Sequence, residues 1–420
     1  MVKKAGGASF LRNVGVLTIG NLFSQGINIA GIMLLSHVYS PENFGLYAVV
    51  FGLAAIVGAV SSLRLEMTIL LPRRENLALS GLVLSVIASL VINLAFLAVL
   101  SGLILAGKAS EALLYSAPVA LMLSIINISA FLQNRRSRYY RTSMVQIFKS
   151  LIFVIVSYLF AGTALDSQGL MIGLLMSVAI PGLALMLMDF REEGLYSNRH
   201  SKRLLRYWFA KNIRFLKYTT PAVLVNNLAM QLPVFALSAL FGSSAAGYYS
   251  MISRILMGPV TLVSGAVNRV YMRVVAEKIA SGEPVFPFTF NLFSKFLYVS
   301  IVGGAFLTIG LHFELLELFF GQSWSDIDAL AMIMVPVFLT AFIAKSIAGF
   351  AVLGKNREGL SYQVLLLLAT GLAILAAHNV SNELGHVFVA ISVALTICYM
   401  TQAGSILSIS RRLDLKGVVK

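Results

Sequence analysis

Residues 247–260 read GYYSMISRILMGPV, an apolar run with one arginine, Arg254, near its middle. Runs of this kind recur along the 420-residue chain, which is 58% hydrophobic and only 12% charged, with a mean hydropathy of +0.87. About a quarter of the residues in a soluble domain are charged. Because many stretches of about 20 apolar residues exceed what buried soluble helices need, the composition predicts an all-α integral membrane protein.

Twelve segments are long and apolar enough to cross a bilayer. They are expected near residues 14–36, 44–63, 78–106, 111–132, 145–161, 168–188, 217–240, 245–268, 292–313, 329–352, 360–377 and 385–410. Twelve is an even number, so both termini are expected on the same side of the membrane.

The charges between these spans give the orientation. Of the 32 Lys and Arg residues, 27 lie on the side of the termini and one, Lys108, lies on the other side. By the positive-inside rule, both termini are cytoplasmic. The net charge of +15 is scattered over short loops rather than gathered on one folded face, so nucleic-acid binding is not expected.

Two features of the sequence limit the chemistry. The single cysteine, Cys398, excludes an internal disulfide and a cysteine-based zinc site, and no metal or cofactor is expected. The chain also lacks HExxH, GxxxxGK[ST] and GxSxG patterns, which argues against an enzyme.

The two halves of the chain resemble each other. With a shift of 202 residues, SPENFGLYAVV (40–50) aligns with GSSAAGYYSMI (242–252), so that Gly45 meets Gly247. This weak repeat predicts two six-helix lobes around a central cavity, related by an axis along the membrane normal. The expected boundaries are 1–188 for the first lobe, 189–216 for a cytoplasmic amphipathic linker and 217–420 for the second lobe.

Polar amides recur at matching places in the first span of each half. They are Gln25 and Asn28 in one half and Asn227 and Gln231 in the other. Because an amide in lipid is costly unless it faces protein or water, these faces point inward. We expect them to line the cleft and bind substrate; the alternative is hydrogen bonding between helices.

Arg254 and Lys345 are the two cations expected deepest in the membrane, about 13 Å and about 12 Å from the nearest span end. All 17 Asp and Glu residues fall in loops or at span ends. A central Arg or Lys costs roughly 2.5 to 3.5 kcal/mol, so both need a wet cavity or an anion. The sequence therefore suggests an anionic substrate such as a phosphate; the rival is a bond to backbone carbonyls freed near Pro259 or Pro336.

Three further cations, Arg64, Arg269 and Lys149, are expected at the cytoplasmic mouth of the cleft, where they would attract an anionic headgroup first. For Lys149 the competing interpretation is a side chain that snorkels to the nearby interface.

Four stretches carry a family resemblance. SPENFGLYA (40–48), LRLEMTILLPRRENLA (63–78), LQNRRSRYYR (132–141) and GYYSMISRILMGPVTLVSGAVNRVYMRVVAE (247–277) occur in this order. Together they resemble the polysaccharide-transporter branch of the multidrug, oligosaccharidyl-lipid and polysaccharide exporter superfamily, to which flippases of O-antigen and other lipid-linked oligosaccharides belong. The resemblance covers nearly the whole chain.

This resemblance implies a flippase of the bacterial cytoplasmic (inner) membrane. It would move an oligosaccharide on undecaprenyl pyrophosphate from the inner to the outer leaflet, for lipopolysaccharide or a related glycan. Arg254 occupies a position at which such flippases are thought to meet the pyrophosphate, whereas its repeat partner is Gly52, so the cation belongs to one lobe only. Membrane lipids and proteins of polysaccharide assembly are the other partners expected.

Two alternative functions remain at this point. A cation-coupled multidrug exporter of the same superfamily would rely on carboxylates inside its spans, and a cavity lined by cations repels cationic drugs. A membrane glycosyltransferase or polymerase would need an acidic catalytic residue and larger outer loops than this chain has.

Overall fold

The computed structural model describes residues 7–72, 74–163, 165–192, 202–381 and 383–417. Its long helices are α1 (Gly7–Ser36), α2 (Pro41–Val60), α3 (Glu75–Leu105), α4 (Ser116–Arg135), α5 (Tyr139–Phe160), α6 (Asp166–Glu192), α8 (Thr220–Phe241), α9 (Ser243–Ser281), α10 (Phe286–His312), α12 (Ile327–Ser346), α13 (Asn356–Val380) and α14 (Leu384–Gly417). Each matches one expected span, and within the described residues eleven helices are long and apolar enough to cross a membrane. The prediction of an all-α membrane protein with about twelve spans is confirmed.

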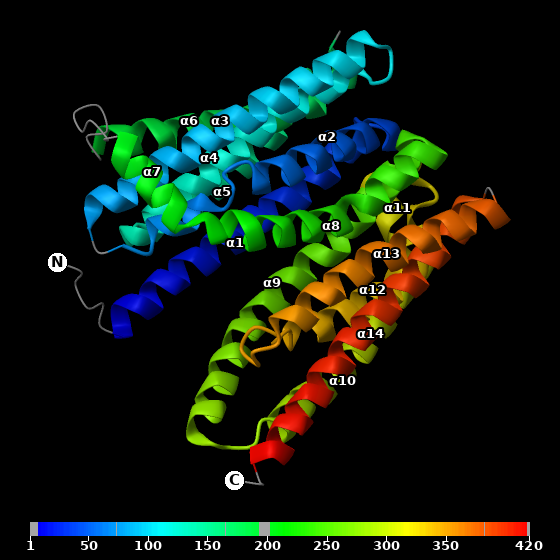
Figure 1. Ribbon diagram of the computed structural model, residues 1–420. Helices are drawn as coiled ribbons and strands as arrows, with labels where there is room; N and C mark the ends of the chain where they lie inside the picture. The colour runs from blue at the N-terminus through cyan, green and yellow to red at the C-terminus, as the bar shows by residue number, and fades with distance from the viewer. Residues whose placement is uncertain (1–6, 73, 164, 193–201, 382, 418–420) are drawn as a thin grey trace. The chain divides into compact units, whose positions relative to one another are not determined.

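The chain divides into two compact units, each built of packed helices (Figure 1). The first contains residues 1–39 and 46–227, and in it α5 packs on both α1 and α6, and α4 packs on both α3 and α6. The second contains residues 40–45 and 228–420, and in it α12 packs on α9, α10 and α14. The side chains along α12 are largely buried because it is the inner helix of its unit.

A glycine contact joins the first turn of α2 to the first turn of α9 inside the second unit. A Cβ atom on Gly45 would overlap the carbonyl oxygen of Ser243, and one on Gly247 would overlap that of Pro41. The glycines that align in the sequence repeat therefore lie against each other, where the two backbones approach too closely for any side chain.

Next to this crossing of α2 and α9 at Gly45 and Gly247, Trp324 is fully buried. It packs edge-on against the rings of Phe44 and Tyr248, at centroid distances of 5.4 and 5.5 Å. Aromatic pairs in this geometry contribute about 0.5 to 1.5 kcal/mol beyond the area they bury. The crossing is thus fixed by both a close backbone contact and a ring cluster.

Substituting Gly247 by Ala is expected to lower the free energy of unfolding by about 2 to 3 kcal/mol, because the added methyl group meets a backbone oxygen that no side-chain rotation can move. Thermal unfolding of the detergent-solubilised protein measures the change. Gly102→Ala on α3 is the matched control, since its methyl group enters open space. Equal unfolding temperatures for the two variants would show that the crossing is not tight.

Several helix ends differ from those expected, and two of them lie on the helices that carry Arg254 and Lys345. Helix α9 runs on to Ser281, so its 39 residues extend about 58 Å, well beyond the hydrocarbon thickness. Its last turns carry Arg273 and Glu277, which form an ion pair of 2.8 Å and make this end compatible with water. Helix α12 ends earlier than expected, at Ser346, because the apolar residues after it form an irregular segment rather than further helical turns.

Two carboxylates stabilise the starts of other helices in the second unit. Asp328 accepts hydrogen bonds from the backbone N–H groups of Leu316 and Glu317, in α11 (Leu315–Phe320), at 3.0 and 2.7 Å. Asp414, on α14, accepts bonds from Val285 and Phe286 at the start of α10, both at 2.8 Å. Negative charge is favourable at a helix N-terminus, so these acids have structural roles.

The amphipathic helix expected in the connection is α7 (Lys202–Lys211); residues 193–201 of that connection lie outside the described residues. It packs on α3 of the first unit, where Trp208 is buried and donates a hydrogen bond of 3.2 Å to the hydroxyl of Thr68. Lys211 lies over the rings of Tyr207 and Trp208 at 5.8 and 5.7 Å, which holds the cation at the edge of the apolar face.

Candidate functional site

The nine residues predicted from sequence fall on both units. Gln25 and Asn28 (α1), Arg64 (before the 3₁₀ helix η1, Leu65–Ile69), Lys149 (α5) and Asn227 (α8) belong to the first unit; Gln231 (α8), Arg254 and Arg269 (α9) and Lys345 (α12) belong to the second. Eight of the nine residues are part-buried, and Arg269 is exposed.

Arg254 is half-buried on α9, eleven residues after the helix begins at Ser243. At 1.5 Å per residue it lies about 17 Å from that end. Pro259 follows little more than one turn later and has no N–H to bond the carbonyl of Ile255. The local sequence therefore places a guanidinium beside a stretch of helix with a weakened hydrogen-bond ladder, well away from either helix end.

Lys345 is in the last turn of α12, one residue before the helix ends at Ser346. A cation is favourable at a helix C-terminus, where the carbonyl dipoles point outward. Its ammonium also lies over the ring of Tyr399 on α14, 5.9 Å from the centroid. Among the described residues no carboxylate lies within 4.0 Å of it.

The segment after Lys345 is held by Asn268 of α9. The side-chain amide of Asn268 donates to the carbonyls of Ser346 and Ala348, at 3.4 and 2.8 Å. These carbonyls belong to the end of α12 and the irregular segment, where the helix leaves them without internal partners. Asn268 is therefore a positioning residue for the turn that carries Lys345, and it is next to Arg269 in the chain.

The expected distance of Lys345 from a helix end was too long. The sequence alone suggested about 12 Å because apolar residues continue to position 352, whereas the structure ends α12 at Ser346. The segment nevertheless stays inside the unit, since Ile347 is fully buried and Leu353 is 6% exposed. Lys345 thus combines a helix-terminal position with an enclosed environment.

The polar face of α1 is used partly for helix packing. Ser24 donates to the carbonyl of Gln146 at 3.0 Å and lies 2.8 Å from the hydroxyl of Ser150, both on α5. Ser24, next to Gln25 in the chain, thus forms hydrogen bonds between helices. Gln25 and Asn28, one position and one turn further on, are half-buried.

On α8 the matching amides behave differently from each other. Asn227 donates to the carbonyl of Val223 in its own helix, at 2.8 Å. Gln231, one turn later, is half-buried, and Pro233 follows inside the helix. A bond to its own helix leaves the carbonyl oxygen of the Asn227 amide available as an acceptor.

Arg64 forms an ion pair that the sequence did not suggest. Its Nη1 lies 3.0 Å from Oε1 of Glu66, and the two side chains are 19% and 0% exposed. Glu66 also accepts hydrogen bonds from the hydroxyl of Ser62 and, at 3.5 Å, from the amide of Asn127 on α4. A buried carboxylate with three donors is a well-satisfied charge, so Arg64 is attached to the interior of the first unit.

The backbone explains how Glu66 becomes buried. Leu63 and Arg64 both have positive φ, 54° and 57°, which costs energy for residues with a side chain and turns the chain back after α2. The η1 helix then enters the unit, where Ile69 packs with Leu79, Leu82, Ile128 and Leu132 of α3 and α4. The segment that follows Arg64 therefore packs inside the first unit.

Other loop cations of the first unit are engaged in ion pairs. Arg136 lies 2.6 Å from Glu75, and Arg141 and Arg138 both bond Glu192. Arg135 donates to the carbonyls of Ile69 and Pro72, each at 2.8 Å. The basic stretch between α4 and α5 thus ties neighbouring helix ends together.

Comparison with known proteins agrees with this architecture. Residues 34–329 match the family model of the polysaccharide biosynthesis protein family. A search of curated protein sequences gives no match.

Among solved structures, the chain resembles lipid II flippase MurJ in an inward closed conformation, with a TM-score of 0.74, 12% identity, and coverage of 96% of this chain and 90% of that one. It also resembles an inward-facing multidrug resistance MATE family transporter of the MOP superfamily, with a TM-score of 0.71, 15% identity, and coverage of 94% and 95%. A third match is the Vibrio cholerae MATE transporter VcmN, with a TM-score of 0.55, 14% identity, and coverage of 96% and 97%. At these identities the likeness concerns the fold.

The family model covers well over half of the chain, and the fold matches run along nearly all of it. The chain therefore belongs to the polysaccharide biosynthesis protein family, and it is a multi-pass membrane protein with the fold of the MurJ and MATE structures.

Proposed function

We propose that this protein moves an oligosaccharide linked to undecaprenyl pyrophosphate from the inner to the outer leaflet of the bacterial cytoplasmic membrane. The termini would lie on the cytoplasmic side, as the loop charges predict. The substrate of the flippase MurJ, as its name states, is lipid II, and a lipid-linked substrate is also what a polysaccharide biosynthesis family would handle.

The observation that carries the proposal is the distribution of charge in the second unit. Arg254 and Lys345 place cations among its packed helices, while Asp328 and Asp414 are used as helix caps. An anionic headgroup complements such an interior, and a guanidinium binds a phosphate through two parallel hydrogen bonds. A cationic drug would meet repulsion there, which disfavours multidrug export.

In this mechanism Arg254 binds the pyrophosphate, and Lys345 adds a second positive charge. The amides of Gln25, Asn28, Asn227 and Gln231 bind sugar hydroxyls, and the polyprenyl chain stays in the bilayer. A conformational change then exposes the bound headgroup to the other side of the membrane.

The entrance residues have unequal roles in the proposal. Arg269 is exposed on α9 and Lys149 is half-buried on α5, so both can attract an approaching anion. Arg64 is bound to Glu66, so a pyrophosphate would have to compete with that carboxylate for the guanidinium.

Reconstitution into liposomes distinguishes the proposed function from drug export. Protein-containing liposomes should translocate a fluorescent lipid-linked oligosaccharide, measured as its accessibility to a membrane-impermeant quencher, and should not extrude ethidium. Empty liposomes are the control. Ethidium extrusion without translocation of the lipid-linked sugar would contradict the proposal and favour the drug exporter.

A further inference from the structure

A cavity of about 770 Å³ lies between α13 and α14, where α13 begins and α14 ends. On α13 its lining residues, between positions 358 and 365, share one helical face. On α14 they lie between Thr401 and Leu413, a length of about 18 Å. The cavity is therefore a groove along two membrane helices, and none of the residues expected to bind substrate line it.

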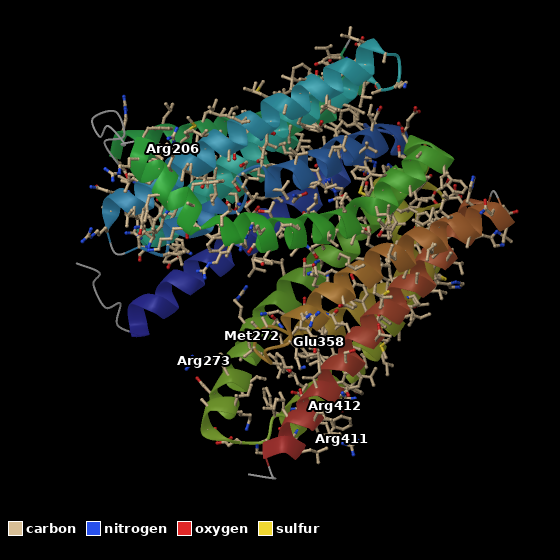
Figure 2. All side chains as sticks on the ribbon, viewed as in Figure 1. Arg206, Met272, Arg273, Glu358, Arg411 and Arg412 are labelled. Carbon is tan, nitrogen blue, oxygen red and sulfur yellow. The ribbon has the colours of Figure 1, made fainter. Side chains whose placement is uncertain are left out.

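One end of the groove is charged. Lys355 precedes α13, Glu358 is in the first turn of α13, and Arg412 lies near the end of α14. Glu358 and Arg412 are labelled on their helices in Figure 2. The Lys355 ammonium is 2.8 Å from the Glu358 carboxylate, which uses one of its three N–H donors. Two cations and one carboxylate leave this end with an excess of positive charge.

The walls of the groove are rich in hydroxyl groups. Ser361 and Tyr362 on α13, and Ser405 and Ser408 on α14, line it. The Tyr362 hydroxyl is enclosed and has no hydrogen-bond partner among the described residues. A polar ligand or an ordered water in the groove would satisfy this donor, since buried polar groups are rarely left unbonded.

Apolar side chains complete the lining. Leu365 lies at the end of the α13 face away from the charges, and Ile409, Leu413 and Phe350 contribute further carbon surface. The charged side chains lie at one end of the groove, beside Leu413 and Phe350, and Leu365 and Thr401 lie toward the other end. The groove therefore combines cations at one end, hydroxyl groups along its walls and carbon surface, which are partners for the phosphate, the glycerol and the acyl chain of a phospholipid.

We propose that this groove binds one anionic glycerophospholipid of the surrounding membrane. The phosphate would lie between Lys355 and Arg412, the headgroup hydroxyls would bond Glu358 and the serines, and an acyl chain would follow Leu365. Basic pockets between membrane helices bind anionic headgroups in this way. The apolar lining favours a lipid over a free phosphate, and the excess positive charge favours an anionic over a zwitterionic headgroup.

Native mass spectrometry of the full-length protein in detergent tests the preference for headgroup charge. Phosphatidylglycerol, phosphatidylethanolamine and phosphatidylcholine are added in equal amounts. We expect phosphatidylglycerol to bind about tenfold more tightly than phosphatidylcholine, because its charge is not balanced by an ammonium group. Equal binding of the three lipids, or a preference for phosphatidylethanolamine, would overturn the proposal.

Charge variants locate the site. Arg412→Gln should weaken phosphatidylglycerol binding about tenfold, since a charge-assisted hydrogen bond is lost. Arg411→Gln removes the same charge from the neighbouring exposed residue, which does not line the groove, and should leave binding close to wild type. An equal loss in both variants would indicate a diffuse surface effect and overturn the assigned site.

A second pair of variants tests the groove by its shape. A Cβ atom on Gly404 meets nothing within 4 Å, so Gly404→Leu should fold normally while its side chain enters the groove. Gly303→Leu on α10 also meets open space and is the matched control. We expect lipid binding to fall at least fivefold only in Gly404→Leu, with both variants retaining the wild-type unfolding temperature; unchanged binding in Gly404→Leu would refute the groove as the site.

The source of the phosphate is distinguished by competition. Glycerol 1-phosphate at millimolar concentration should not displace phosphatidylglycerol, because it lacks the acyl chain. Undecaprenyl pyrophosphate should displace it less effectively than unlabelled phosphatidylglycerol does. Efficient displacement by either competitor would replace the phospholipid assignment with a soluble-phosphate site or a substrate site. The proposed function does not depend on this result.

Discussion

Replacing Arg254 by Glu is expected to reduce glycan export by about 100-fold or more. The substitution removes a half-buried guanidinium from α9 and puts a carboxylate in its place, so an anionic headgroup meets repulsion instead of two hydrogen bonds. A 100-fold decrease corresponds to about 3 kcal/mol of lost interaction. The measurement is surface glycan at normal expression level, in a strain that lacks the native copy of the gene.

Graded substitutions separate charge from geometry at this position. Arg254→Lys keeps the charge but loses the planar fork, so it should retain more export than Arg254→Ala, which should in turn retain more than Arg254→Glu. The matched control is Arg273→Glu, which makes the same charge change on the exposed end of the same helix. Full export by Arg254→Glu would eliminate the anion-binding role.

Much of the fold could be predicted because its signal is local. Apolar length and loop charge locate spans without knowledge of their neighbours, and each expected span has its helix. The ends of the spanning helices were less predictable, since hydropathy does not distinguish a buried irregular segment from a helical turn. For that reason residues after Ser346 were expected to be helical, and the polar end of α9 was expected to be a loop.

The candidate site was only partly predictable because contacts between helices leave little trace in one sequence. Arg254 and Lys345 were conspicuous as cations in apolar runs. Asn268 holds the end of α12 and the ring of Tyr399 lies under Lys345, but neither residue type is unusual in its own segment. Glu66 carried a weak signal, an acid two residues after Arg64 in an otherwise apolar stretch.

Glu66→Ala is expected to destabilise the protein by about 3 kcal/mol or more. The carboxylate is fully buried, and its loss leaves the Arg64 guanidinium, 19% exposed, without the charge that balances it. The Nε of Arg64 is already enclosed without a hydrogen-bond partner among the described residues, so the cation has little else to bond. Glu75→Ala is the matched control: its ion pair with Arg136 is partly exposed and should contribute at most about 1 kcal/mol.

A double-mutant cycle shows whether the loss arises from the pair itself. If Arg64 and Glu66 stabilise each other, the double variant with Ala at both positions should lose less stability than the two single variants add up to, because neither charge is then left alone. Alanine is preferred to glycine at Arg64 because glycine would also relieve the positive φ of 57°. Additive losses would mean that the two charges are independent. A strong coupling would mean that an anionic headgroup binds Arg64 only by displacing Glu66. The ion pair would then oppose substrate entry instead of promoting it.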